Sequence, residues 1–152
     1  RFGESQAALL GAPHTRMRDL YRAFNVLLNP SYGEGFGIPV IEAQSCGIPV
    51  IVTDWTAMTE VGEVGWHVGG QRTWTDQGSY MKTPDTEQLT RALESAYDMA
   101  DRMAGPAREH ALKYDTERVA TEYWVPAIDA IIDRLGIGRP ARMPVPTELV
   151  PA

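Results

Sequence analysis

Two acidic residues, Glu34 and Glu42, stand eight positions apart on either side of a glycine-rich turn. Carboxylates accept hydrogen bonds, so a pair of them can hold the hydroxyl groups of one ligand at two places. The turn has glycines at positions 33, 35 and 37, and glycine lets a bulky ligand approach the main chain without meeting a Cβ. These residue types in this order suit a large ligand that is rich in hydroxyl groups.

The elements around this turn are predicted by local patterns. Phe24 to Leu28 is a short apolar run closed by Asn29-Pro30-Ser31, which predicts a buried strand that ends in a loop. Pro39 suits the first turn of a helix, and we expect this helix to run from about Ile38 to Cys46. Its first free N–H groups and its positive dipole end would face the glycine turn and form an anion site suited to a diphosphate.

Glu34 precedes the expected helix and Glu42 lies about one turn inside it, roughly 5 Å further along the axis. The two carboxylates could therefore bracket a nucleotide sugar, which has a ribose at one end and a hexose at the other. The spacing also fits a second interpretation, in which a glycine-rich turn caps a helix and Glu42 is solvated on its surface. A glycine loop alone does not separate the two.

A longer pattern surrounds these residues. The stretch from Asn29 to Glu60, NPSYGEGFGIPVIEAQSCGIPVIVTDWTAMTE, closely resembles the donor-binding core of retaining GT-B glycosyltransferases, the large family with an E-x7-E motif. The resemblance continues more weakly through Gly65 and Val68 to TPDTEQLTRAL and covers roughly residues 17 to 135. It implies transfer of a sugar from a nucleoside diphosphate sugar to an acceptor that the sequence does not identify.

The resemblance also implies a role for each site residue. Glu42 would bind the ribose hydroxyls of the donor, and Glu34 would lie by the transferred sugar as the candidate catalytic residue. The residues whose backbone would face the sugar and phosphates are Gly35, Phe36, Gly37 and Ile38. The candidates of second rank at the same site are Ser31, Tyr32, Thr56 and Glu60.

The order of predicted elements favours an α/β fold with a parallel sheet, because strands and helices alternate along the chain. The resemblance specifies a Rossmann-like sheet with flanking helices, an incomplete C-terminal half of a GT-B fold. We expect residues 1–136 to be a partial donor-binding domain and residues 137–152 to be a Pro-rich flexible tail. The first domain, which would hold the acceptor, is expected elsewhere in the same protein. A non-catalytic nucleotide-sugar-binding module and an α/β interaction domain are the alternatives.

Composition excludes several other classes of function. Fourteen basic against twenty acidic residues give a net charge of −6, which argues against nucleic acid as a partner. A single cysteine, Cys46, excludes an intramolecular disulfide and multi-cysteine metal motifs and favours a reducing, cytoplasmic location. We expect no metal and no cofactor. Arg16, Arg18 and Arg22 on a helix over residues 15–24 could meet a membrane, but a solvated helix face is the favoured interpretation.

Downstream, Val50 to Thr53 is predicted to form a second strand, with the loop from Asp54 to Glu60 at the same sheet edge as the glycine turn. Trp55 in this loop and His67 beyond it are further site candidates. Residues 69–83 are longer than the matching connection in the family and are expected to form a surface loop. Its Trp74 and Tyr80 would pack on each other or offer an aromatic platform to a sugar or partner.

The C-terminal third is predicted to be helical. One helix would begin with Thr86 as N-cap and end at Gly105-Pro106, followed by a separate helical stretch over Ala107 to Tyr114. A last helix over Thr116 to Leu135 would be kinked at Pro126.

Overall fold

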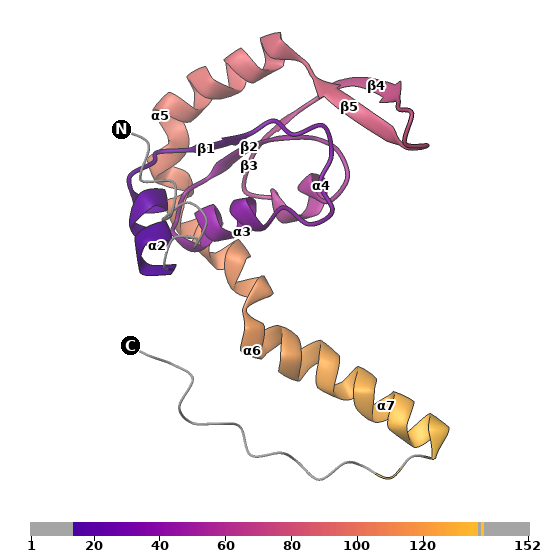
Figure 1. The fold of residues 1–152 in the computed structure, drawn as a ribbon. Helices are drawn as coiled ribbons and strands as arrows, with labels where there is room; N and C mark the ends of the chain where they lie inside the picture. Colours follow the sequence, from indigo (N-terminus) through magenta and orange to yellow (C-terminus); the bar gives the residue numbers. More distant parts are fainter. Residues whose placement is uncertain (1–13, 137, 139–152) are drawn as a thin grey trace, which may run out of the picture. The chain divides into compact units, whose positions relative to one another are not determined.

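The computed structural model describes residues 14–136 and residue 138. The described residues fall into two compact units, with the boundary between Asp115 and Thr116 (Figure 1). The tail predicted over residues 137–152 lies, apart from Gly138, outside the described residues.

A three-stranded parallel sheet forms the centre of the first unit. Its strands are ordered β1-β2-β3 and comprise Leu27–Asn29, Val50–Thr53 and Gly65–Val68. Leu27 pairs with Val50, and Val50 pairs with Gly65 on the other side. All four residues of β2 are buried, as expected for a run of β-branched residues between two neighbouring strands. The predicted limits of β2 are confirmed, whereas β1 begins three residues later than the apolar run that predicted it.

Helices cover both faces of this sheet. Side chains alternate along a strand, so Val50 and Val52 pack with the helix α3 (Ile38–Ser45), whereas Ile51 between them packs with Ala96 of the helix α5 (Thr86–Ala111). The helix α2 (His14–Arg22) adds Tyr21 to the α3 side. The result is a Rossmann-like α/β arrangement with two apolar clusters, which confirms the predicted fold class.

The helix α3 has the limits that its sequence predicts. Pro39 lies in its first turn, and Gly47 follows its end with a left-handed φ of +79°. The loop expected over Asp54–Glu60 is different, because its second half is a short helix, α4 (Met58–Val61). Buried Gln44 ties the two helices together by donating a 2.6 Å hydrogen bond from Nε2 to the carbonyl of Val61.

The segment over residues 69–83 is not the expected surface loop. It forms an antiparallel hairpin of two strands, β4 (Gly70–Trp74) and β5 (Tyr80–Pro84). Trp74 and Tyr80 face each other across the strands, and their rings pack edge to face at 4.8 Å. The expected packing between the two aromatic rings is therefore confirmed, but in a regular hairpin.

The helix α5 (Thr86–Ala111) also differs from the prediction, because it continues through Gly105-Pro106 and ends in the 3-10 turn η1 (Leu112–Tyr114). Ala107, directly after the proline, is fully buried, and this packing keeps the segment helical past Pro106. Figure 1 shows α5 as one continuous helix. Asp85, not Thr86, is the N-cap, since its carboxylate accepts a 2.8 Å hydrogen bond from the amide of Gln88.

The second unit is helical. It comprises α6 (Thr116–Val119), the π-helical segment η2 (Ala120–Trp124) and α7 (Val125–Leu135). Instead of the predicted kink at Pro126, the helix widens into the π segment just before it, and the proline lies in the first turn of α7. Within the described part of the chain, no helix has the length and apolar character needed to span a bilayer.

Candidate functional site

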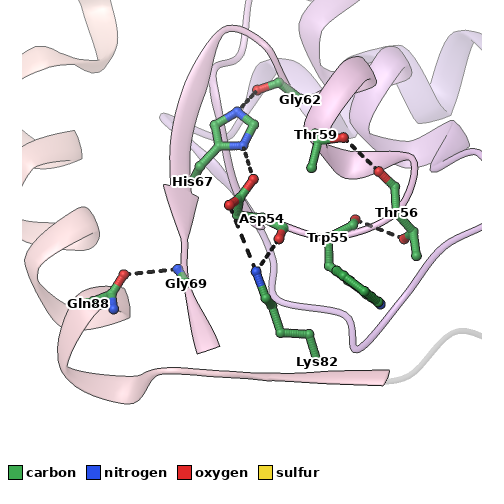
Figure 2. Close-up of polar contacts among 9 residues, drawn as sticks. All are labelled: Asp54, Trp55, Thr56, Thr59, Gly62, His67, Gly69, Lys82 and Gln88. Atoms are coloured by element: carbon green, nitrogen blue, oxygen red, sulfur yellow. Dashed lines mark hydrogen bonds and ion pairs between the residues drawn. The ribbon is translucent and has the colours of Figure 1, made fainter. Parts of the chain in front are cut away.

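The loops that follow β1 and β2 leave the same edge of the sheet, as their parallel pairing requires. A hydrogen bond joins them, because the amide of Glu34 donates to Oγ1 of Thr56 over 3.0 Å. The structure thereby brings together Glu34 and Thr56, which the sequence predicts at one site. Thr56 has a left-handed φ of +51°, which is uncommon for a β-branched residue. Its carbonyl accepts a 2.8 Å hydrogen bond from the hydroxyl of Thr59 and so helps to hold this conformation (Figure 2).

Two glycines of the turn have different surroundings. Gly37 is buried at the start of α3 with a φ of +88°, and a Cβ there would overlap with Cε of Met58 in α4. Gly35 has no atom of another element within 4 Å of the place where a Cβ would stand. Space for a ligand therefore lies at Gly35, whereas Gly37 is required by the packing of two helices.

The start of α3 lies at this edge of the sheet. No side chain caps it, and its first two residues, Ile38 and Pro39, are exposed. The proline has no N–H to offer, so an anion would be bound by the remaining amides of the turn and by the positive end of the helix dipole. Phe36 and Ile38, which are 47% and 61% exposed, add apolar surface beside this helix start.

Glu42 is half-buried on α3, and a side chain from α2 orients it. The hydroxyl of Tyr21 donates a 2.9 Å hydrogen bond to Oε2 of Glu42. Burial, followed by this hydrogen bond and the negative charge of Glu42, raises the pKa of Tyr21 to about 12. Tyr21 therefore remains a donor at neutral pH, and Oε1 of Glu42 is left to accept from another group. The sequence indicates only that Tyr21 lies on an apolar helix face, so its contact with Glu42 is not predicted.

The carboxylate of Glu34 is half-buried and has no hydrogen-bond or ion-pair partner among the described residues. Glu34 is the one charged residue in the sequence of the turn, residues 31–37, and another molecule could pair with it. Ser31 nearby has a buried hydroxyl that is likewise unpaired within the described part.

The contact between Tyr114, at the end of η1, and Phe36 is a second contact that the sequence does not predict. The ring of Tyr114 packs edge to face on Phe36 at 5.8 Å, so the C-terminal end of α5 supports the glycine turn. Burial, and then the negative charges of Glu60 and Glu63, raise the pKa of Tyr114. Glu60, a candidate of second rank, thus acts electrostatically on Tyr114 from an exposed position on α4.

The hairpin is attached to the same edge of the sheet. The amide of Lys82 donates a 2.9 Å hydrogen bond to the carbonyl of Tyr32, and the Lys82 ammonium group donates to the carbonyl of Asp54. That ammonium lies 3.8 Å from the Asp54 carboxylate, and only 11% of the Lys82 side chain is exposed. Figure 2 shows Lys82 reaching from β5 toward Asp54, beside the ring of Trp55.

The side chain of His67 contacts Asp54 and Gly62, and it does not contact Glu34 or Glu42. Its Nδ1 lies 3.7 Å from the carboxylate of Asp54, and its Nε2 lies 3.0 Å from the carbonyl of Gly62 (Figure 2). Trp55 is covered by two cations, because the guanidinium of Arg72 and the ammonium of Lys82 lie 4.6 and 5.6 Å from its ring centre. These contacts make His67 and Trp55 supports of the loop after β2.

Comparison with known proteins gives a consistent group of relatives. Residues 3–99, well over half of the chain, match the family described as glycosyl transferases group 1. The chain is 35% identical to a D-inositol 3-phosphate glycosyltransferase from Gordonia bronchialis over 77% of its own length and 22% of the relative. It is 29% identical to the lipopolysaccharide core biosynthesis mannosyltransferase LpsB from Rhizobium meliloti over 88% of its own length and 35% of that protein. An O-antigen chain mannosyltransferase B from Escherichia coli is 47% identical over 30% of the chain and 12% of the relative. The chain thus spans about a fifth to a third of the first two relatives.

Proposed function

This chain belongs to the family of group 1 glycosyl transferases, and we propose that it is the donor-binding part of an enzyme that transfers a sugar from a nucleoside diphosphate sugar to an acceptor. The observation that carries the proposal is the arrangement at the edge of the sheet. There the open space at Gly35, the uncapped start of α3 and the carboxylates of Glu34 and Glu42 belong to one loop and helix. This set offers groups for phosphates and for hydroxyls in the order in which a nucleotide sugar carries them.

The proposed roles follow from the contacts. The diphosphate lies at Gly35 and the start of α3, where the helix dipole stabilises the negative charge that develops on the leaving group. Glu42 binds the ribose through Oε1, since Tyr21 already holds Oε2. Glu34 accepts hydrogen bonds from the transferred sugar and fixes its orientation. Retention of anomeric configuration and the absence of a bound metal are proposed from the family resemblance of residues 29–60.

The remaining partners belong to the same proposal. The acceptor is held mainly by a further domain of the same protein, and the donor is the ligand of the part described above. We propose a cytoplasmic location on the evidence of the single cysteine, and no nucleic-acid partner on the evidence of the net charge of −6.

Calorimetric titration of the 152-residue chain with UDP, GDP and ADP and with their hexose derivatives tests the proposal. We expect one nucleotide series to bind and Glu42→Ala to lose about 1–3 kcal/mol, the cost of removing a charged acceptor from ribose hydroxyls. Glu34→Ala should weaken the nucleotide sugar and leave the free nucleotide diphosphate unchanged, because Glu34 is assigned to the sugar. Glu94→Ala, which removes an exposed acidic residue of α5, is the matched control and should change neither affinity.

Two results would contradict the proposal. Equal affinities for wild type and Glu42→Ala would remove the ribose assignment. Failure of every nucleotide to bind would favour the alternative of an α/β interaction domain.

A further inference from the structure

We propose that the exposed aromatic pair on the hairpin, Trp74 and Tyr80, binds a pyranose ring of the acceptor. The inference rests on the proposed function, because it assigns a second sugar to the end of the donor site. It gives this domain a part in acceptor binding in addition to its part in donor binding.

The pair is preformed and accessible. Trp74 and Tyr80 are partners in the register of the hairpin, and their rings meet edge to face at 4.8 Å. Trp74 is 60% exposed and Tyr80 is 56% exposed, so most of both rings is available to a ligand. Since the two rings support each other, binding would cost little ordering of side chains.

The face with these rings is the face turned toward the candidate site. Side chains alternate along a strand, so Arg72 shares a face with Trp74, and Lys82 shares a face with Tyr80. Arg72 and Lys82 both lie over the ring of Trp55 in the loop after β2. The aromatic pair is therefore one step of two residues, roughly 7 Å, further out on the same surface.

A main-chain bond fixes the distance between the hairpin and the glycine turn. The amide of Lys82 donates to the carbonyl of Tyr32, two residues before Glu34. In Figure 1 the hairpin projects on the side of the molecule where the loops after β1 and β2 emerge. Glu42 lies further along, on α3, where it meets Tyr21 of α2. The hairpin thus adjoins the end of the donor site that is assigned to the transferred sugar, where the acceptor must enter.

The chemistry of the hairpin fits a sugar. One face of a pyranose is a surface of C–H groups that packs on an aromatic ring, while its hydroxyls bond to polar neighbours. The residues that flank the pair toward the turn, Thr75 and Ser79, are uncharged and polar. Met81, next to Tyr80, lies on the opposite face, and the basic Arg72 and Lys82 on the same face lie over Trp55. A lipid surface would instead require exposed aliphatic and basic side chains beside the rings. The turn between the strands, Thr75 to Ser79, contains the acidic Asp76 and no basic or aliphatic residue.

The indole N–H signals of the four tryptophans provide a direct test in ¹H–¹⁵N NMR spectra of the 152-residue chain. Trp74→Phe assigns the signal of Trp74, and the other three signals serve as internal controls. The probes are methyl α-mannopyranoside and methyl α-glucopyranoside up to roughly 100 mM, which detects a Kd on the order of 10 mM. We expect at least one probe to shift the Trp74 signal in a saturable way. Tyr80→Ala, which keeps the Trp74 signal, should weaken that probe at least about fivefold, whereas Gln71→Ala, on the opposite face of the hairpin, should not.

Other outcomes would overturn the inference. No saturable shift of the Trp74 signal with either sugar would do so, and so would a shift caused by phosphatidylcholine vesicles but by neither sugar. Parallel titration with UDP, GDP and ADP keeps the two proposals separate. If a nucleotide binds but neither sugar shifts the Trp74 signal, only the proposal of an aromatic sugar site is contradicted. If a sugar shifts the Trp74 signal but no nucleotide binds, only the proposal of a donor site is contradicted.

Discussion

Tyr21 and Glu42 form a pair whose strength should depend on pH. Tyr21 is 6% exposed, and its pKa is raised from the ordinary value of 10 to about 12. The unfolded chain therefore loses this proton near pH 10, while the folded chain holds it until about pH 12. The resulting stability is complete below pH 10 and is lost as the pH rises from 10 to 12, up to about 2–3 kcal/mol.

Tyr21→Phe should remove this pH dependence. At pH 8 we expect the variant to be less stable than wild type by about 1–2 kcal/mol, because Glu42 loses a hydrogen bond. Urea unfolding at pH 8 and at pH 11 measures the difference at both values. The difference between variant and wild type should shrink at the higher pH, and a difference that stays constant would show that Tyr21 ionises normally in the fold.

At the scale of elements, the contact between α3 and α4 depends on Gly37. A methyl group at this position would overlap with Met58 and would require a left-handed φ, so we expect Gly37→Ala to destabilise the fold by about 2–4 kcal/mol. Gly35→Ala is the matched control, because nothing lies near its Cβ position, and its stability should change by under about 0.5 kcal/mol. Thermal unfolding distinguishes the two variants.

The same pair of variants separates stability from binding. If a ligand occupies the open space at Gly35, Gly35→Ala should lower nucleotide affinity while the melting temperature remains unchanged. A Gly35→Ala variant with wild-type affinity would place the ligand elsewhere.

Lys82 should determine how firmly the hairpin is held. Lys82→Met leaves the carboxylate and carbonyl of Asp54 without their cation in a place where only 11% of the lysine side chain is exposed. Hydrogen exchange of the β4 and β5 amides should then become about tenfold faster. Arg91→Met removes an exposed pair with Glu87 and should leave exchange unchanged. Equal protection in both variants would mean that the main-chain bond to Tyr32 is sufficient.

The elements differ in how far their sequences predict them. The limits of β2 are predictable because its β-branched run lies between Pro49 and Asp54. The limits of α3 are predictable because Pro39 lies at its start and Gly47 follows its end. The hairpin has no alternation of apolar and polar residues, because the side chains that contact the loop after β2 are the charged Arg72 and Lys82. Its strands therefore have no periodic signal to detect.

Other differences arise from packing that local rules do not include. Proline usually ends a helix, but burial of Ala107 holds α5 together past Pro106. The glutamates and the glycine turn are visible in the sequence because they lie within nine residues of one another. Tyr21 and Tyr114 reach Glu42 and Phe36 from distant segments, and only the tertiary fold brings them there.

For the whole molecule, the candidate site belongs to the first of the two compact units. Every residue assigned to it, from Tyr21 to Tyr114, lies before the boundary at Asp115, and so do both apolar clusters. A chain that ends at Asp115 should therefore fold and keep its nucleotide affinity within about twofold, which is under 0.5 kcal/mol. Calorimetry on the shortened chain and on the full chain makes the comparison. A folded short chain with no affinity would show that residues 116–152 contribute to binding.

The bond from the Lys82 amide to the Tyr32 carbonyl is a bond between main-chain groups. Substitution of the exposed hairpin side chains therefore leaves this attachment unchanged, so natural selection can alter Trp74, Tyr80 and their neighbours without moving the hairpin from the glycine turn. The same independence makes the hairpin a suitable segment for a combinatorial library, in which new aromatic and polar side chains are screened while the scaffold and its donor site remain constant.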